Sequence, residues 1–488
     1  MDLRIARNKK TRREFLRLTG LAVGAAAFSA CGGPTPTPVV VEQEKVVKET
    51  VEKQVTEIVQ VVVTATPYPK PPVVLPVAPV VTPAPEKPID IAYWDLYGRL
   101  VWHGQDLKQV PVDLWNQANP NIRVSYLPGA GAKEKVLTAV ASGTPPDLLM
   151  TDPPTEYVYR KAVDSLQPYL DRGDHPYIEK DIYPGVWRAM AFKGQVYAIH
   201  RVPNNAGMYI NADLFQQAGL DPDNPPKTLA EVEECAAKIH KVGSNGDIEI
   251  LGFSPWLNIA GIWGTWAEAF GAELWDEANN RVTFDEEKSV RALEWQVEYA
   301  NKFGGYEKIL AFNDALAGMD PFGSGRVGIY ITGPWQIGIM QDSYPAINYR
   351  TSTMPIPDGG RGGSWLGGSW LVMPRGGKNK DITWEFMKWY CGKECQDYEG
   401  TQGIGFTIWP EVNEKNEWFN TLEQLKPFIK DLPGCWPIPL IPTVNHAFFT
   451  AFNPMVDECL RGKRTPLDAM REATRIAQEE VDRFISNL

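Results

Sequence analysis

The sequence contains few of the residues and motifs on which enzyme chemistry usually depends. Only five of its 488 residues are histidine and six are cysteine. These residues are scattered and lack the paired Cys or His spacing of a structural zinc site. There is no Gly-x-Ser-x-Gly elbow, no His-Glu-x-x-His pair and no phosphate-binding loop. We therefore expect no metal, no cofactor and no catalytic residue.

Positively charged residues are fewer than negatively charged ones. Lysine and arginine number 49 against 60 aspartate and glutamate, which gives a formal net charge of −11. Nucleic acid is excluded as an expected partner, because phosphate binding needs a basic face. With 43% hydrophobic and 22% charged residues, the composition is typical of a globular protein with more than one domain.

No apolar run is long enough for a mature membrane span. The longest N-terminal candidate, residues 21–31, is short and follows the twin arginines Arg12 and Arg13. A positive segment, an apolar segment and small residues predict a twin-arginine (Tat) signal peptide over residues 1–30. We therefore expect an exported protein, in the periplasm or outside the cell.

The end of this signal predicts a lipid anchor. "FSAC" (28–31) resembles a bacterial lipobox, in which the cysteine is lipid-modified and becomes the first residue. Phe28 replaces the usual leucine, and cleavage before Cys31 without a lipid is the alternative. Acyl chains on Cys31 contribute about 0.8 kcal/mol per buried CH₂ and fix a lipoprotein to the outer face of the cytoplasmic membrane.

Lipidation of one cysteine leaves five others. Export permits disulfides, but an odd number leaves at least one thiol free. The sequence does not determine their pairing. They are Cys235, Cys391, Cys395, Cys435 and Cys459.

Residues 31–88 read as a tether rich in proline and valine. The stretch 66–88 is Pro-rich and predicts an extended chain. Before it, valine and isoleucine recur every three or four residues between Val47 and Val62, which indicates a helical stripe or a disordered spacer. In either form, the tether holds the globular part away from a membrane.

From residue 89 the pattern is α/β. Strand-like runs at 89–94, 121–127 and 146–152 alternate with helical runs at 110–118 and 132–143. Further helices are expected at 228–242, 286–303 and in the C-terminal tail. Alternating strands and helices predict mostly parallel sheets covered on both faces, and 400 residues are enough for two lobes.

Aromatic residues are abundant, with 17 Trp, 18 Tyr and 18 Phe. In "GIYITGPWQIG" (328–338) a strand ends in Gly-Pro and is followed at once by Trp335. An indole at a strand end either packs in the core where a helix starts or faces a ligand cleft. The sequence contains several tryptophans in comparable positions.

Several segments, in order, resemble the extracellular solute-binding proteins of ABC importers, in the sugar-binding group that includes maltose-binding protein. The Gly-Pro-Trp segment 322–338 and the run "GMYINADLFQQAGL" (207–220) match most clearly. Further matching segments are 142–152, 367–390 and 461–473. The resemblance covers nearly all of residues 89–488 and is carried by the order and spacing of these segments.

The resemblance implies an α/β, two-lobed periplasmic-binding-protein-like fold (type II). Each lobe is a mixed, mostly parallel sheet flanked by helices, with a ligand cleft between the lobes. Lobe I is expected at 89–204 and 368–405, and lobe II at 208–365 and 410–488. The expected crossings lie near 205–207, 366–367 and 406–409. A monomer is the family expectation.

The resemblance also implies candidate ligand contacts. They are tryptophans that can stack on sugar rings and polar side chains that can bind hydroxyl groups. For Trp94 and Trp335 a core position is the alternative, and for Asp152 a capping role. The candidates are Trp94, Asp95, Tyr97, Asp152, Asn204, Trp256, Trp335, Trp365, Ser369, Trp409 and His446.

The function implied is capture of a sugar or oligosaccharide and its delivery to ABC permease subunits, with no reaction. A secreted polysaccharide hydrolase or lyase remains an alternative, because paired carboxylates can lie far apart in sequence. A receptor-type binding protein for a non-sugar solute is the other alternative. The sequence does not specify the solute.

Overall fold

The computed structural model describes residues 40–47, 55–62, 73–82, 84–102, 105–257, 264–403 and 405–488. The predicted signal peptide, Phe28 and Cys31 lie outside these residues. The chain divides into two units, Met1–Thr66 and Pro67–Leu488. Among the described residues, no helix has the length and apolar character needed to cross a membrane.

The first unit differs from its predicted helical stripe. Strand β1 (Val40–Val47) pairs antiparallel with β2 (Val55–Val62), in a register that joins Val40 to Val62. The helix prediction is therefore wrong for these residues. Their valines are β-branched, and such side chains favour strands over helices.

The second unit contains a large mixed sheet in the order β10-β18-β7-β3-β6, with β19 paired to β18. Strand β3 pairs in parallel with both β6 and β7, whereas β18 runs antiparallel to β7 and β10. The strands are β3 (Ile89–Asp95), β6 (Ile122–Leu127), β7 (Leu148–Thr151), β10 (Ile199–Asn204), β18 (Trp365–Val372) and β19 (Trp436–Pro437).

A small sheet has the order β16-β11-β17. Its strands are β11 (Gly207–Asn211), β16 (Ile329–Thr332) and β17 (Tyr349–Thr353). Both of its pairings are antiparallel, so the expectation of mostly parallel strands fails here.

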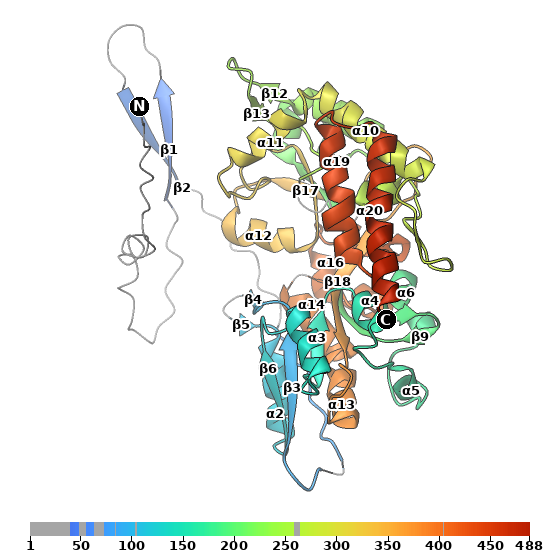
Figure 1. The fold of residues 1–488 in the computed structure, drawn as a ribbon. Helices are drawn as coiled ribbons and strands as arrows, with labels where there is room; N and C mark the ends of the chain where they lie inside the picture. The colour runs from blue at the N-terminus through green and yellow to red at the C-terminus, as the bar shows by residue number, and fades with distance from the viewer. Residues whose placement is uncertain are drawn as a thin grey trace, which may run out of the picture. The chain divides into compact units, whose positions relative to one another are not determined.

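Helices cover both faces of the large sheet. Trp115 of α2 (Gln109–Ala118) packs on Phe386 of α13 (Lys380–Tyr390), and Phe386 reaches Tyr93 of β3. Helix α3 (Lys133–Ala141) lies on the opposite face, where Lys135 meets Trp94. Figure 1 shows α2, α3 and α13 around β3 and β6.

The helices near the small sheet include the expected amphipathic elements. Thr228 and Glu231 form a capping box at the start of α8 (Leu229–Ile239), and Thr465 caps α20 (Pro466–Ser486). Helices α19 and α20 lie side by side with α10 (Figure 1). The others are α7 (Ala212–Gln217), α9 (Thr265–Ala269), α10 (Glu287–Lys302), α11 (Tyr306–Asp314), α12 (Trp335–Ser343) and α19 (Asn453–Leu460).

Short elements make up the remaining connections. The helical ones are α4 (Thr155–Tyr159), α5 (Gln167–Leu170), α6 (Pro184–Met190), α14 (Lys393–Gly403), α15 (Pro410–Lys415), α16 (Glu417–Thr421), α17 (Lys426–Asp431), α18 (Val444–His446) and the π-helix η4 (Ala447–Phe452). Two-residue strands form the hairpins β4-β5 (Val101–Trp102, Gln105–Asp106), β8-β9 (Ala191–Phe192, Gln195–Val196) and β14-β15 (Trp275–Asp276, Arg281–Val282). Strands β12 (Lys241–Val242) and β13 (Ile248–Ile250) form a fourth.

Candidate ligand-binding site

Two predicted site residues meet at the carboxyl edge of the large sheet. The phenol of Tyr97, just after β3, donates a hydrogen bond to the carboxylate of Asp152, just after β7. Both side chains keep access to solvent, and Tyr97 is 37% exposed. Burial raises the pKa of Asp152 above its ordinary range, although the hydrogen bond from Tyr97 opposes this shift. The same burial, followed by the charge of Asp152, raises the pKa of Tyr97.

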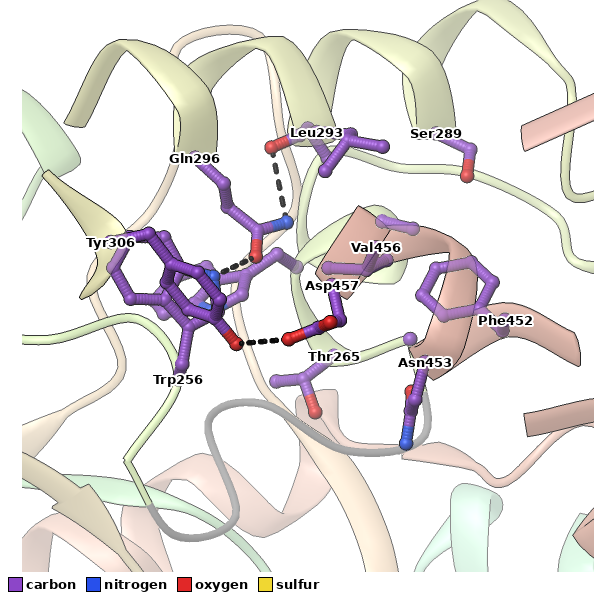
Figure 2. A pocket seen from close by; sticks show the side chains of 14 residues that line it. Trp256, Thr265, Ser289, Leu293, Gln296, Tyr306, Phe452, Asn453, Val456 and Asp457 are labelled. Carbon is purple, nitrogen blue, oxygen red and sulfur yellow. Dashed lines mark hydrogen bonds between the residues drawn. The ribbon is translucent and has the colours of Figure 1, made fainter. Parts of the chain in front are cut away.

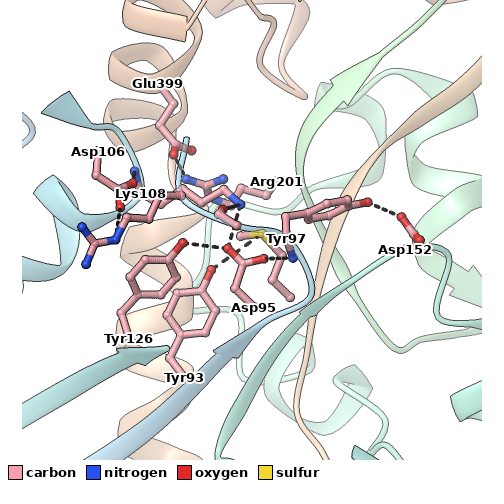
Figure 3. Close-up of polar contacts among 12 residues, drawn as sticks. Tyr93, Asp95, Tyr97, Asp106, Lys108, Tyr126, Asp152, Arg201 and Glu399 are labelled. Atoms are coloured by element: carbon pink, nitrogen blue, oxygen red, sulfur yellow. Dashed lines mark hydrogen bonds and ion pairs between the residues drawn. The ribbon is translucent and has the colours of Figure 1, made fainter. Parts of the chain in front are cut away.

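Asp95 lies beneath this edge rather than on it. Its carboxylate is fully buried and accepts hydrogen bonds from Lys108 Nζ at 2.7 Å, from the Tyr126 hydroxyl at 2.8 Å and from the Tyr97 backbone N–H at 2.8 Å (Figure 3). Lys108 Nζ also lies 5.1 Å from the centre of the Tyr97 ring. Asp95 and Lys108 therefore fix the turn that presents Tyr97.

A second buried ion pair supports the same region. Arg201 of β10 pairs with Glu399 of α14, and both side chains are 2% exposed. The Arg201 guanidinium carbon lies 4.7 Å from the centre of the Tyr390 ring (Figure 3 shows Arg201 above the Asp95 network). The pair links strand β10 to the helix that leads to the third expected crossing.

Trp94 faces the other side of β3. It is half-buried, and Lys135 Nζ lies 4.3 Å from the centre of its ring, a cation–π distance. Its side chain alternates with those of Tyr93 and Asp95, as a strand requires. Trp94 therefore does not share a surface with the buried Asp95 carboxylate.

The glycines beside two candidate tryptophans explain how these indoles lie against the backbone. A Cβ atom at Gly333 would come within 2.0 Å of the half-buried Trp335 ring, and one at Gly367 within 2.1 Å of the Trp365 ring. Trp335 begins α12 directly after β16, whereas Trp365 is 5% exposed at the start of β18. The Gly-Pro-Trp motif thus places an indole directly against Gly333 at the end of a small-sheet strand.

Trp256 borders a cavity of ≈ 150 Å³ among α9, α10, α11 and α19. Its indole Nε1 donates to Gln296 Oε1 at 2.8 Å, and its ring meets Tyr306 edge-on at 5.1 Å. The Tyr306 hydroxyl donates to Asp457 Oδ1 at 3.1 Å (Figure 2). The cavity therefore combines aromatic walls with amide, hydroxyl and carboxylate groups.

The first expected crossing is tied to two other segments. Asn205 is fully buried and donates to the Phe428 carbonyl oxygen at 3.1 Å, and the Ala206 N–H donates to Ser364 Oγ at 2.8 Å. The Oδ1 atom of Asn204 is buried and has no hydrogen-bond partner among the residues that the structure describes. Ser369, on β18 beside β10, is 9% exposed.

The last two candidates lie in different surroundings. Trp409 is fully buried, with its ring stacked 6.1 Å from that of Tyr177, so it has no free surface in this structure. His446 is half-buried at the end of α18, directly before the π-helix η4. Phe449 in that π-helix is 50% exposed and was not singled out from the sequence. The sequence signal for Phe449 was the aromatic run "AFFTAF" (447–452), which is equally typical of a buried core segment.

Sequence reasoning also missed a buried polar cluster. Trp436 Nε1 donates to Glu268 Oε2 at 2.7 Å, Arg361 pairs with Glu268 at 3.3 Å, and the Arg361 guanidinium lies 4.1 Å from the centre of the Trp436 ring. Burial raises the pKa of Glu268 to about 8, although Arg361 and Trp436 both lower it. Any two of these three residues are at least 75 positions apart in the sequence, so no local motif predicts the cluster.

The structure thus joins Tyr97 to Asp152 and places Asp95 below them. A larger groove of ≈ 1010 Å³ between α6 and α15–α17 contains none of the predicted residues. All five cysteines among the described residues are free thiols.

Known proteins resemble this chain along most of its length. It is 27% identical over 327 residues to the mannitol-binding protein of Pseudomonas aeruginosa, covering 63% of this chain and 73% of that protein. It is 22% identical over 306 residues to the maltotriose-binding protein of Pyrococcus abyssi, covering 60% and 62%.

Among solved structures, CpMnBP1 with mannotriose bound has a TM-score of 0.69 and 27% identity, covering 80% of this chain and all of that one. The sugar-binding protein MalE of Xanthomonas citri has a TM-score of 0.67 at 19% identity, covering 81% and 98%. The periplasmic-binding-protein-like fold is therefore confirmed. The model of the family described as bacterial extracellular solute-binding protein matches residues 112–427, more than half of the sequence, and the chain belongs to that family.

Proposed function

We propose that this protein captures a sugar or short oligosaccharide and delivers it to the permease subunits of an ABC importer without transforming it. The observation that carries the proposal is the Tyr97–Asp152 pair at the carboxyl edge of the large sheet. Open α/β sheets bind ligands at this edge, and the phenol oxygen of Tyr97 and the carboxylate of Asp152 offer acceptors to the O–H groups of a sugar.

Flat indoles supply the complementary surface. A sugar ring has a C–H face that packs on an aromatic ring and a rim of hydroxyl groups that needs polar partners. Trp335 and Trp256 are half-buried indoles of the proposed lobe II (208–365 and 410–488), here called the small-sheet half. The names of the relatives, which refer to mannitol, maltotriose and mannotriose, support a polyol or oligosaccharide as the ligand.

The proposed arrangement has two lobes that close on the ligand. Lobe I comprises 89–204 and 368–405 and lobe II comprises 208–365 and 410–488. Strand β10 of the large sheet ends at Asn204 and strand β11 of the small sheet begins at Gly207, which supports the first crossing. Closure then depends on contacts that the ligand makes in the closed form alone.

Export and anchoring complete the proposal. Arg12 and Arg13 would direct export through the twin-arginine route, and Cys31 would carry the lipid. Mass spectrometry of the protein from its native membrane tests this step. We expect an N-terminal peptide that begins at an acylated Cys31, and an unmodified N-terminus would contradict the anchor.

The binding function is tested by identifying what the protein retains. We expect native mass spectrometry of the purified protein, or titration with mannotriose, maltotriose and mannitol followed by tryptophan fluorescence, to reveal one bound sugar or polyol. Incubation should return that sugar unchanged, since no reaction is proposed. Cleavage of the added oligosaccharide would instead favour a hydrolase, and no response to any of the three would contradict a ligand of this class.

A further inference from the structure

The segment 73–82 lies against the protein instead of leaving it as a free tether. Asn119, at the end of α2, is 5% exposed and holds this segment at two points. Its Oδ1 accepts a hydrogen bond from the Val81 N–H at 2.9 Å, and its Nδ2 donates to the Pro79 carbonyl oxygen at 2.9 Å. One buried amide therefore satisfies a backbone donor and a backbone acceptor, as a neighbouring strand would.

A second attachment lies four residues earlier. Trp389 Nε1 of α13 donates to the Val77 carbonyl oxygen at 2.9 Å, and the Val77 N–H donates to Glu394 Oε2 of α14 at 3.4 Å. The Trp389 ring packs on Trp115 of α2 at 5.6 Å, which holds the donor in place. Pro76 is buried beside these contacts.

These attachments lie far from the candidate ligand-binding edge. Each of the hydrogen bonds goes to the end of α2, to α13 or to α14, which belong to the proposed lobe I (89–204 and 368–405), here called the large-sheet half. The segment leads into the amino end of β3, where the Ile89 N–H donates to the Asn121 carbonyl oxygen at 2.9 Å. Tyr97 follows the other end of this strand, about 20 Å away at roughly 3.3 Å per residue.

We infer that residues 73–82 are a docked strap, which fixes the point where the N-terminal tether leaves the protein and attaches it to the large-sheet half alone. A proline-rich segment has few conformations to lose, so a few hydrogen bonds are sufficient to hold it. Force from a membrane anchor then acts on the large-sheet half, and the small-sheet half can move without displacing the tether. The strap itself is independent of the proposed ligand; only the source of the force rests on the proposed function.

Amide hydrogen exchange on the whole exported chain tests the strap. We expect the Val77 and Val81 amides to exchange at least about tenfold more slowly than in a synthetic peptide of residues 73–82, since each docking hydrogen bond contributes about 1 kcal/mol. The double variant Asn119→Leu, Trp389→Phe removes the acceptor of the Val81 N–H and the donor to the Val77 carbonyl oxygen, and should restore the exchange rate of the free peptide at Val81. The Val77 N–H keeps its acceptor, Glu394 Oε2, so the Val81 amide is the readout of this variant.

Trp418→Phe is the matched control, because Trp418 is a half-buried tryptophan whose Nε1 has no hydrogen-bond partner in the described part of the chain. It should leave strap exchange unchanged. Free-peptide exchange in the wild type would overturn the inference, as would a double variant in which the Val124 amide of β6 accelerates as much as that of Val81. Faster exchange of β11 or β16 in the double variant would overturn attachment to one half.

Discussion

Tyr97 and Asp152, which are 55 residues apart, are joined by a hydrogen bond across the ends of two parallel strands. Neither residue reaches its position by local sequence alone. Asp95 and Lys108 hold the turn before Tyr97, and β7 ends immediately before Asp152. The pair is therefore a small, supported polar surface at the edge where this fold class binds ligands.

Removal of the Tyr97 hydroxyl should weaken sugar binding. Tyr97→Phe keeps the ring but loses the donor to Asp152, and we expect about tenfold weaker binding of mannotriose, the loss of roughly one hydrogen bond. Calorimetry measures the change. Tyr197→Phe, which removes a hydroxyl from the β8-β9 region, is the control. Equal affinity in the wild type and Tyr97→Phe would remove the pair from the site.

Breaking the buried pair below it should destabilise the fold. Asp95→Asn leaves Lys108 buried without a charged partner, and we expect a loss of about 3–5 kcal/mol in the free energy of unfolding. Lys108→Met added to Asp95→Asn should recover much of that loss. Urea denaturation provides the measurement, and Asp381→Asn at the exposed Arg172–Asp381 pair is the control expected to change little. A single variant as stable as the wild type would contradict the proposed support.

Gly333 should be needed for the position of Trp335. Gly333→Ala places a methyl group where the indole lies, so the ring must move away from the strand end. We expect sugar affinity to fall about tenfold, with a smaller change in melting temperature. Gly377→Ala, where the nearest atom lies 3.4 Å from the added carbon, is the matched control. Unchanged affinity in Gly333→Ala would indicate that Trp335 does not contact the ligand.

His200 should make the fold sensitive to acid. Burial lowers the pKa of this histidine to about 3, from an ordinary value of 6.5, although a backbone hydrogen bond with Gly367 opposes the shift. The unfolded chain takes up the proton below pH 6.5, but the folded chain does so only near pH 3. Acid therefore favours unfolding by roughly 1.4 kcal/mol per pH unit across that window.

The His200→Leu variant removes the imidazole that takes up this proton in the unfolded chain. Between pH 6 and pH 4, its free energy of unfolding should fall less steeply than that of the wild type, as measured by urea denaturation at each pH. Parallel pH profiles would show that His200 does not titrate in this way.

Glu268 should have the opposite effect, a loss of stability as the pH rises from 4.5 to 8. Its pKa is raised to about 8 by burial, so the folded chain keeps a proton that the unfolded chain loses near pH 4.5. Stability from this group is present below pH 4.5 and is lost as the pH rises to 8, by roughly 1.4 kcal/mol per unit. Glu268→Gln keeps an acceptor for Trp436 and should remove this slope in thermal unfolding. A variant whose melting temperature keeps the pH dependence of the wild type would refute the shift.

The sequence was sufficient to predict the elements that have strong local patterns. The strand at 89–94, the helices at 110–118 and 286–303 and the Thr228 cap lie within one or two residues of their predicted positions. Hydrophobic periodicity and capping chemistry are local properties, so a single sequence is sufficient to predict them.

Burial was not predictable in the same way. Asp95 and Trp409 follow the same kind of motif as Tyr97 and Trp335, yet both are fully buried. Their environment is set by Lys108, Tyr126 and Tyr177, which are distant in sequence, and by tertiary packing that no local pattern contains. The antiparallel small sheet and the Glu268 cluster have the same origin, because both depend on contacts between remote segments.

Sugar capture is tested most directly by calorimetric titration of the purified wild type, Trp335→Ala and Trp275→Ala with mannotriose, maltotriose and mannitol. We expect one-to-one binding of at least one of these ligands, with a Kd on the order of micromolar or tighter. We also expect affinity to fall at least about tenfold in Trp335→Ala and to stay unchanged in Trp275→Ala, whose tryptophan lies in the β14-β15 hairpin. Absence of binding to all three ligands would refute sugar capture, and equal affinity in Trp335→Ala and the wild type would remove Trp335 from the site.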